Sequence, residues 1–445
     1  MKIKSLILCL IILLTFGLTA FCACDNDIPN NGNGNPGVQN PADMNGEKNT
    51  VTTVSGGLAE KAKLGFDVKA QLKEWGIVND FSLKEALLPI WDTKNVYNET
   101  VSFVGKTDTA KLLYTPTKIH KVYDYYLGKE YVEGVDFVVN GNQITLTENT
   151  AVNYWQKTDY YGIVKPSISI TLKTKDGYYL PVSEVLANTH QICVSYEHND
   201  KWQGIIPVAQ TEKFSNTIAK LKNGQGLKIG VVGDSITVGC GSSGYLKYHE
   251  GNTDPVLGGV NPYNVEGLSY IRLVNEYLNA KFPLASIELD NKAVGGSAAD
   301  KGADQVSKLT IVPDLMIIAF GMNDAGGTVE NYYKRIKATI DAVVAKNPQV
   351  EILLVSSMLP NNELVGWTGN IPTFESKLLE ISKEYKNTVK IGVAPMTSMS
   401  QSTYDLGKRS CDMNSSNVNH PNDFIHRVYA QTVLKVLLGN DFTTL

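Results

Sequence analysis

The second half of the chain alternates short apolar runs with longer amphipathic segments. The apolar runs carry few charges, as buried strands do, and cover residues 227–235, 286–294, 313–324, 350–358 and 389–395. The amphipathic segments between them have helical character and cover residues 267–282, 299–309, 329–347 and 373–387. Strands that are apolar on both faces and alternate with helices predict a parallel sheet with helices on both sides. We therefore expect an α/β domain over residues 226–445.

The final segment carries the clearest helical period. Its mostly apolar residues recur at i, i+3, i+4, i+7 and i+8, and they are Ile425, Val428, Tyr429, Thr432, Val433, Val436 and Leu437. This spacing places them on one side of a helix. We expect a helix with one buried stripe.

The region before residue 210 has a different pattern, with short runs rich in β-branched and aromatic residues. The runs cover residues 99–105, 111–125, 135–149, 166–174 and 190–198. Turn residues separate them, and Asn140-Gly141 inside one run is a strong hairpin signal. Many short strands with turns between them predict a β-sandwich. We place it in an N-terminal region over residues 57–215, of which residues 57–95 are expected to be partly helical.

The N-terminus is typical of an export signal over residues 1–24. Two lysines precede an apolar run of residues 6–21, which is short for a membrane span of ~20 residues; a retained membrane helix is the alternative. Cys24 resembles the lipid-carrying cysteine of a bacterial lipoprotein signal, with Cys22 as the alternative. Residues 25–56, rich in Asn, Gly and Pro, predict a flexible tether. We expect an extracellular protein, lipid-anchored to the outer face of the bacterial cytoplasmic membrane.

Composition narrows the choice of partner and cofactor. Of 445 residues, 43% are hydrophobic, which is enough for a packed core, and the net charge is −4. A mildly acidic chain without a concentrated basic patch argues against nucleic-acid binding. Outside the signal, the cysteines are Cys193, Cys240 and Cys411, and they form no metal-binding motif. We expect mostly free thiols, with one disulfide as the alternative, and no metal or cofactor.

Polar residues follow several of the predicted strands. Ser235 ends the first, a Gly295-Gly296 turn follows the second, Asn323 follows the third, and His420 precedes the last helix. Functional groups gather at the carboxyl ends of parallel strands, so we expect these residues on one rim. A serine beside a histidine suits acyl transfer, with the serine as nucleophile and the histidine as base. Backbone N–H groups and an asparagine amide would stabilise the tetrahedral oxyanion.

The same positions carry a family resemblance. "GDSIT", "AVGGS", "GMND" and "HPND", in this order within residues 227–442, resemble the four sequence blocks of the GDSL, or SGNH, hydrolases. The resemblance implies a flavodoxin-like three-layer α/β/α sandwich and a serine hydrolase that acts on esters. It also implies Ser235 as the nucleophile, His420 as the base, and Gly296 and Asn323 as oxyanion donors. Gly295 is the alternative to Gly296.

This chain departs from the family at the acid of the triad. The family usually has Asp three residues before the base histidine, and this chain has Asn417 there. An amide can orient an imidazole but cannot stabilise its charge. We expect a Ser–His dyad in which a backbone carbonyl holds His420. Asp412 and Asn417 are the alternative third members.

Four other polar residues near the rim have structural interpretations. Asp234 and Asp324 adjoin the predicted catalytic residues, and we expect them to hold their loops in place. Asp423 lies at a helix start, where we expect it to act as a cap. His426 competes with His420 for the role of base, but it lies inside the last helix, so we prefer His420.

Aromatic residues near the rim are candidates for substrate contacts. Tyr245 and Tyr263 lie in the long connection over residues 239–267, and Trp367 follows the fourth strand. Long loops near active sites often bind substrate, and aromatic faces suit sugar rings. The alternative is an ordered cover over the sheet.

The order of a β-sandwich and an SGNH domain resembles that of carbohydrate esterases with an N-terminal jelly-roll domain. The resemblance implies an extracellular serine esterase that deacetylates an acetylated polysaccharide. Two alternatives stay open: a general short-chain esterase or lipase, and a non-catalytic surface protein that binds glycans. The expected partners are the ester substrate and, through the lipid anchor alone, the membrane.

Overall fold

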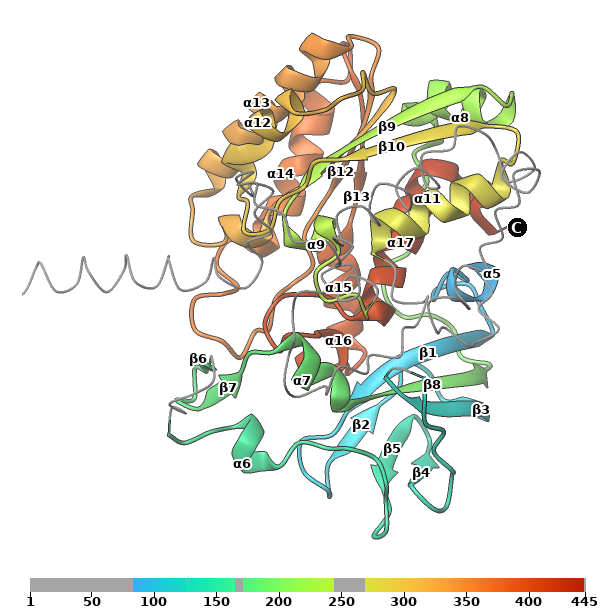
Figure 1. The fold of residues 1–445 in the computed structure, drawn as a ribbon, viewed down its shortest axis with the longest axis vertical. Helices are drawn as coiled ribbons and strands as arrows, with labels where there is room; N and C mark the ends of the chain where they lie inside the picture. Colours follow the sequence, from blue (N-terminus) through green and yellow to red (C-terminus); the bar gives the residue numbers. More distant parts are fainter. Residues whose placement is uncertain (1–82, 126, 165–170, 244–268, 444–445) are drawn as a thin grey trace, which may run out of the picture.

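The computed structural model describes residues 83–125, 127–164, 171–243 and 269–443, and its C-terminal domain is built on five parallel strands (Figure 1). The strands are β9 (Gly226–Gly233), β10 (Ser286–Asn291), β11 (Leu315–Ala319), β12 (Glu351–Val355) and β13 (Lys390–Ala394). Their order is β10-β9-β11-β12-β13, so the direction of progress across the sheet reverses between β9 and β11. In open α/β sheets such a switch point forms a crevice at the carboxyl ends of the strands, where ligands bind.

Helices cover both faces of this sheet. On one face lie α12 (Gly302–Ser307), α13 (Val329–Lys346) and α14 (Ile371–Glu384); on the other lie α11 (Tyr270–Lys281) and α17 (Asp423–Leu438) (Figure 1). Because both faces are covered, every residue of β11 and β12 is buried. The predicted flavodoxin-like α/β/α sandwich is confirmed. Shorter elements of this domain are α8 (Ser215–Lys222), α15 (Met396–Asp405), α16 (Ser410–Met413), η2 (Thr211–Phe214), η4 (Ala299–Lys301) and η6 (Gly439–Thr443).

The N-terminal domain consists of small antiparallel sheets, as the β-rich pattern predicts. One sheet has the order β1-β8-β3, a second has the order β2-β5-β4, and β6 pairs with β7. The strands are β1 (Asn95–Ser102), β2 (Thr109–Lys111), β3 (Pro116–Asp124), β4 (Phe137–Asn140), β5 (Gln143–Leu146), β6 (Thr171–Lys173), β7 (Tyr179–Pro181) and β8 (Gln191–His198). The predicted hairpin is β4–β5, and Gly141 in its turn has a φ of +59°, which favours glycine. Short helices are α5 (Leu83–Ala86), α6 (Lys157–Tyr160) and α7 (Glu184–Thr189).

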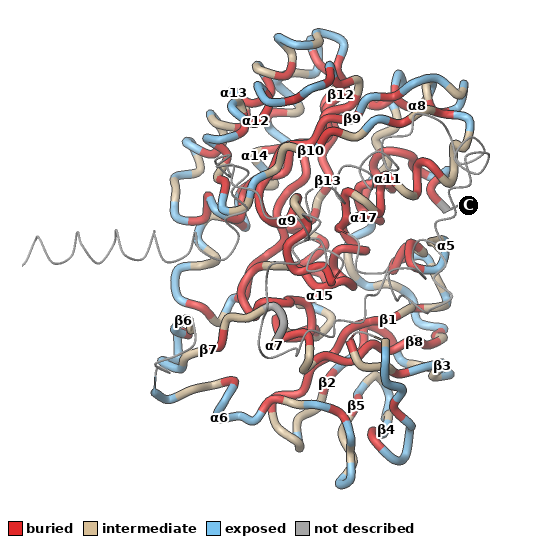
Figure 2. Tube along the Cα trace, in the orientation of Figure 1, coloured by how far each residue is buried: buried red, intermediate tan, exposed pale blue. Residues whose placement is uncertain are grey.

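The two domains share one continuous core. Val101 in β1 and Phe103 just after it belong to the same buried cluster as Ile425 and Val428 of α17. β1 lies against α16 and α17 and is buried along most of its length (Figure 2). The N-terminal domain is therefore packed onto the C-terminal one over the region where the last helix begins.

This packing changes the environment of α17. The sequence predicts one buried stripe, but nearly all residues of the helix are buried, including Arg427 and Gln431 on its polar side. The N-terminal domain covers that side, since Arg427 donates to the Asn98 carbonyl (2.8 Å) and Gln431 donates to the Leu88 carbonyl (2.8 Å). A helical period reports one apolar face and cannot show that polar side chains on the other face are also covered.

Several sequence predictions lie outside the described residues. These are the export signal, Cys22 and Cys24, the tether, residues 57–82, and both loop tyrosines, Tyr245 and Tyr263. In the parts of the chain that the structure describes, no helix is long and apolar enough to span a bilayer. Cys193, Cys240 and Cys411 are buried thiols and form no disulfide with one another there.

Candidate active site

The predicted nucleophile lies at the carboxyl end of β9, at the switch point of the sheet. Ser235 is the first residue of the short helix α9 (Ser235–Val238), and Asp234 caps that helix by accepting a hydrogen bond from the N–H of Ile236 (3.0 Å). The first residues of a helix have no carbonyl one turn back to bind, so the N–H of Ser235 points outward from the helix start. The Ser235 hydroxyl lies 3.0 Å from Nε2 of His420, which is hydrogen-bonding distance.

His420 is carried by a tight loop before α17. An isolated bridge pairs Asn414 with Pro421, and the N–H of Ser415 donates to the His420 carbonyl (3.0 Å). Inside the loop, the Ser416 hydroxyl accepts from the N–H of His420 (3.3 Å). The backbone of the histidine is thus held from two directions while its ring reaches Ser235. The predicted nucleophile and base are brought together although 185 positions separate them.

The two predicted oxyanion donors lie on neighbouring loops of the same rim. The N–H of Ser297 donates to the Val294 carbonyl (3.3 Å), which closes a turn with Gly296 at φ +72°. A positive φ at this turn position favours glycine. Gly296 is exposed and a side chain there would meet nothing within 4 Å, so its backbone stays open to a ligand.

Asn323 lies in η5 (Met322–Asp324), directly after β11. Its Nδ2 donates to the Ser297 carbonyl (3.0 Å), which orients the amide toward the glycine turn. An amide nitrogen carries two hydrogens, so the second can serve an oxyanion. The residue is exposed, as a substrate-facing donor has to be. The two loops that would form the oxyanion hole are therefore tied to each other.

Asp324 holds its loop in place, as predicted. Its carboxylate accepts from the N–H of Ala299 (3.0 Å) and pairs with Arg335 (3.4 Å). Burial raises its pKa, although the bond from Ala299 and the Arg335 charge oppose the rise. Asp234 is buried more deeply, and the desolvation raises its pKa to about 7 despite the bond from Ile236 and the nearby His420. Asp234 and Asp324 therefore hold the backbone next to Ser235 and Asn323 through hydrogen bonds from Ile236 and Ala299.

The structure does not support Asp412 as the third catalytic member. Its Oδ1 accepts from the N–H of Ser102 on β1 (2.8 Å), and its Oδ2 accepts from the N–H of Arg409 (2.8 Å). Both carboxylate oxygens thus accept hydrogen bonds from backbone groups, so the alternative that Asp412 is the third member is wrong. The position of Asp412 eight residues before His420 does not show that β1 of the other domain binds its carboxylate.

Asn417, at the family's acid position, has its amide nitrogen bound elsewhere, and its buried Oδ1 has no hydrogen-bond partner among the described residues. It is buried with a φ of +61°, and its Nδ2 donates to the Pro181 carbonyl (3.1 Å) at the end of β7. Its own carbonyl accepts from Nδ2 of Asn361 (2.9 Å). Asn417 therefore links the histidine loop to both domains. The expectation that a backbone carbonyl holds the imidazole stays a prediction.

His426 has the structural role expected of it. Its Nδ1 accepts from the N–H of Tyr270 (3.3 Å) and its Nε2 donates to the Cys240 carbonyl (3.2 Å). Burial lowers its pKa to about 3, so the ring is neutral.

The prediction that Asp423 caps the last helix is wrong, because the cap is Asn422, whose side chain accepts from the N–H of Ile425 (3.2 Å). Asp423 instead accepts from the N–H (2.8 Å) and the hydroxyl (2.7 Å) of Ser243 and so joins α17 to the chain that follows α9.

Two residues that the sequence analysis did not single out hold the site together. The Gln305 side chain donates to the carbonyl (3.0 Å) and accepts from the N–H (2.9 Å) of Gly233, and it also donates to the Ser297 hydroxyl (3.1 Å). It thereby joins the strand of the nucleophile to the glycine turn. Gly241, at φ +89°, packs directly against the backbone of the His420 loop. For Gly241, the glycine-rich segment after Ser235 was the only signal in the sequence.

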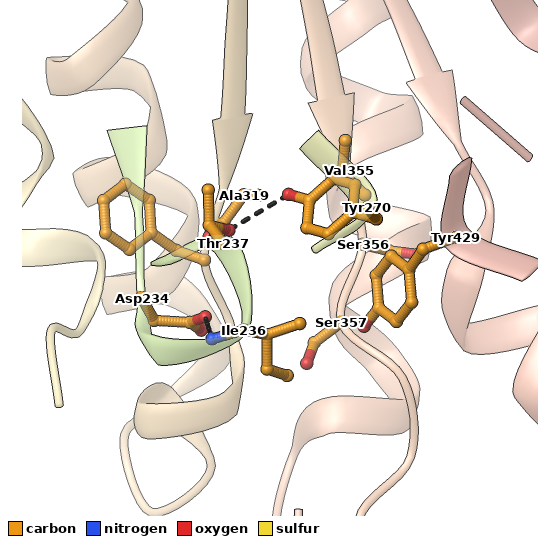
Figure 3. A pocket seen from close by; sticks show the side chains of 10 residues that line it. Asp234, Ile236, Thr237, Tyr270, Ala319, Val355, Ser356, Ser357 and Tyr429 are labelled. Atoms are coloured by element: carbon orange, nitrogen blue, oxygen red, sulfur yellow. Dashed lines mark hydrogen bonds between the residues drawn. The ribbon is translucent and has the colours of Figure 1, made fainter. Parts of the chain in front are cut away.

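Trp367 packs against a second buried cluster that includes Trp155, Leu364 and Val418. Its role as a substrate contact stays a prediction. Beneath α9 lies a cavity of about 10 Å³, lined by Asp234, Thr237, Tyr270 and other residues (Figure 3). It is the size of about one water molecule. The cavity is therefore too small to hold an organic substrate.

Part of the C-terminal domain matches the model of a known family. Residues 231–428 match the model of the GDSL-like lipase/acylhydrolase family. None of the curated proteins compared with the chain matches it. One similar solved structure is a two-domain esterase (CEX) active on acetylated mannans, with 20% identity and a TM-score of 0.38 over 52% of this chain and 54% of that chain. The match thus spans about half the length of that protein.

Two other solved structures are each similar to about half of this chain. Axe2, an acetylxylan esterase from Geobacillus stearothermophilus, is 18% identical with a TM-score of 0.36, over 49% of this chain and 98% of that chain. LAE5, an α/β hydrolase enzyme from the metagenome of Lake Arreo, is 22% identical with a TM-score of 0.34, over 47% of this chain and 93% of that chain.

Proposed function

We propose, from the premise that residues 231–428 form a GDSL-like lipase/acylhydrolase domain, that this chain hydrolyses carboxylic esters through Ser235 and His420. The observation that carries the proposal is the 3.0 Å approach of the Ser235 hydroxyl to Nε2 of His420 at the switch point of the sheet. The imidazole can accept the hydroxyl proton as the serine oxygen attacks the ester carbonyl.

The rest of the rim suits the intermediate of this reaction. The attack turns the carbonyl oxygen into an oxyanion, which the N–H groups of Ser235 and Gly296 and the amide of Asn323 can stabilise. His420 then gives its proton to the leaving alcohol, and the acyl group stays on Ser235. A water molecule, deprotonated by His420, attacks the acyl-enzyme and releases the carboxylic acid. As the bond between the acyl group and Ser235 breaks, His420 returns this proton to the serine oxygen, which restores the free enzyme.

We extend the proposal to the substrate and the location. An acetyl group on an extracellular polysaccharide fits an exported enzyme, and the N-terminal residues 1–24 resemble a lipoprotein signal. The aromatic residues Tyr245, Tyr263 and Trp367 suit sugar rings. Replacing Cys24 by Ser should then release the protein from the membrane into the medium. Continued attachment of C24S would point to Cys22 or to an uncleaved helix.

A comparison of esters tests the reaction and its substrate. Wild type should release acetate from acetylated glycans faster than it cleaves chromogenic esters of longer acids. Ser235→Ala and His420→Ala should each lower kcat by several orders of magnitude with the fold intact, because such residues act as a unit. An equal preference for all short esters would favour a general esterase. Turnover by Ser235→Ala equal to that of wild type would exclude the mechanism.

A further inference from the structure

The loop that carries His420 is held by the N-terminal β domain through a group of buried side chains. Asn422, two residues after His420, is fully buried, and its Nδ2 lies within hydrogen-bonding distance of Thr100 Oγ1 (2.8 Å) and Gln191 Oε1 (3.0 Å). It also donates to the Asp412 carbonyl (2.8 Å). Thr100 lies on β1 and Gln191 begins β8, so two strands of one domain meet one residue of the other.

Both the oxygen and the nitrogen of the Gln191 amide form hydrogen bonds with this loop. Its Nε2 donates to the carbonyls of Cys411 (2.8 Å) and Asn414 (2.7 Å), while its Oε1 accepts from Asn422. These three positions stand on both sides of His420 in the sequence. Gln191 is 2% exposed, so water cannot replace the bonds at low cost. A single side chain of the N-terminal domain therefore binds both ends of the histidine loop.

The chain just before the loop is held by β1 and by Asp108, which lies just before β2. Lys408 is fully buried, and its Nζ binds Glu99 Oε1 (2.8 Å) and the Thr100 carbonyl (2.7 Å) on β1. Arg409 binds Asp108 (2.6 Å). A fully buried ion pair has to keep its geometry, because separating the two buried charges costs a large amount of stability. The entrance to the loop thus has a defined position relative to β1.

From these contacts we infer that the N-terminal β domain is part of the catalytic apparatus, because Gln191 and Thr100 position the imidazole of His420 against Ser235. The inference rests on the proposed ester hydrolysis and assigns both residues a positioning role without contact to substrate. The β domain would then be required for the chemical step even where the substrate is too small to reach it.

The chain contains a matched control for Gln191. Gln431 is also a buried glutamine with 2% exposure that joins the N-terminal segment to α17. Its Nε2 donates to the carbonyls of Leu88 (2.8 Å) and Ala86 (3.4 Å), and its Oε1 accepts from the N–H of Ile90 (3.1 Å). It lies nine residues after Asn422, which is about 13 Å along a helix. Both glutamines have three interdomain or loop bonds, but only Gln191 binds the loop of His420.

The experiment compares Gln191→Met with Gln431→Met in the full chain, using a small chromogenic acetate ester. Both variants should lose a similar part of their stability in urea. Gln191→Met should lower kcat by roughly 10–100-fold with KM changed by less than about threefold, since a displacement of about 1 Å at a catalytic group costs about 10²-fold. Gln431→Met should keep the kcat of wild type. Thr100→Val removes one hydroxyl and should also lower kcat. It provides the test of the inference if Gln191→Met does not fold.

A double-mutant cycle separates positioning from general damage. If Gln191 acts through His420, the Gln191→Met change should have no further effect on the residual rate of His420→Ala. An undiminished effect in that background would overturn the inference, and so would a Gln191→Met enzyme with the kcat of Gln431→Met. Failure of the proposed function gives a different result, since Ser235→Ala and His420→Ala would then remain active.

Discussion

Gly241 offers a direct test of how closely the histidine loop is packed against the chain after Ser235. An alanine Cβ at this position would lie closest to the Pro421 carbonyl oxygen, 2.5 Å from the Ser415 hydroxyl and 3.0 Å from His420 Cβ. The Ser415 hydroxyl can rotate away, but the Pro421 carbonyl belongs to the backbone. The whole loop therefore has to move, and a shift on the order of 0.5–1 Å would lengthen the 3.0 Å contact between Ser235 and His420.

We expect two separable effects of Gly241→Ala. The φ of +89° costs an alanine about 1–2 kcal/mol of stability. The displaced imidazole should lower kcat by roughly 10–100-fold, a loss of about 1.4–2.7 kcal/mol in transition-state stabilisation. Gly177→Ala is the control for the first effect alone, because Gly177 has a φ of +93° and its Cβ would meet nothing within 4 Å.

Hydrolysis of a chromogenic acetate ester and urea unfolding measure both effects in the two variants. Gly177→Ala should be less stable than wild type with an unchanged kcat. Gly241→Ala should be less stable and also slow. Equal kcat values for Gly241→Ala and Gly177→Ala would refute the reasoning, since they would show that the loop accepts the methyl group without moving His420.

Three further substitutions test the remaining assignments. Asn323→Ala should lower kcat by roughly 10²–10³ with little change in KM, as the loss of one oxyanion donor does; a change confined to KM would make Asn323 a binding group. The pKa of Asp234 is about 7 in the folded protein, above its ordinary value of 3.8. Protonated Asp234 therefore contributes to the free energy of unfolding in full below pH 3.8. As the pH rises to about 7, up to about 4 kcal/mol of this stabilisation is lost. Asp234→Asn should therefore gain stability relative to wild type between pH 4 and pH 7 in urea unfolding, and a constant difference over that range would contradict the shift. Asp412→Asn should destabilise the contact with Ser102 and lower kcat by less than about tenfold; a loss near 10⁴ with an intact fold would restore Asp412 as the triad acid.

The contacts along β1 connect the N-terminal domain to the part of the chain that leads into the loop of His420. Lys408, Arg409 and Asp412 all bind β1 or its neighbours just before the histidine loop. Such polar contacts are specific in direction as well as in distance, so they fix an orientation that apolar packing alone would leave looser. A removable domain would be expected to meet its neighbour through a more exposed surface.

The sequence by itself determined the α/β architecture and the central residues of the site. Apolar runs and helical periods are local properties, and they predicted the five strands of the C-terminal sheet and the helix α17. The order of elements then placed Ser235, Gly296, Asn323 and His420 at one end of that sheet, because parallel strands end on the same side. Ser235 and His420 are indeed in contact.

Only the tertiary structure decided what supports those residues. Gln191 and Asn422 lie 231 positions apart, and no local pattern records that a glutamine on β8 binds both ends of the histidine loop. The same holds for Asp412, which the sequence left open as an alternative third member and whose carboxylate accepts hydrogen bonds from the backbone of Ser102 on β1 and of Arg409. A polar side chain has several chemically equivalent partners in a sequence. Which partner it binds depends on the packing of the domains, and that packing arises from the summed burial of surfaces that are distant along the chain.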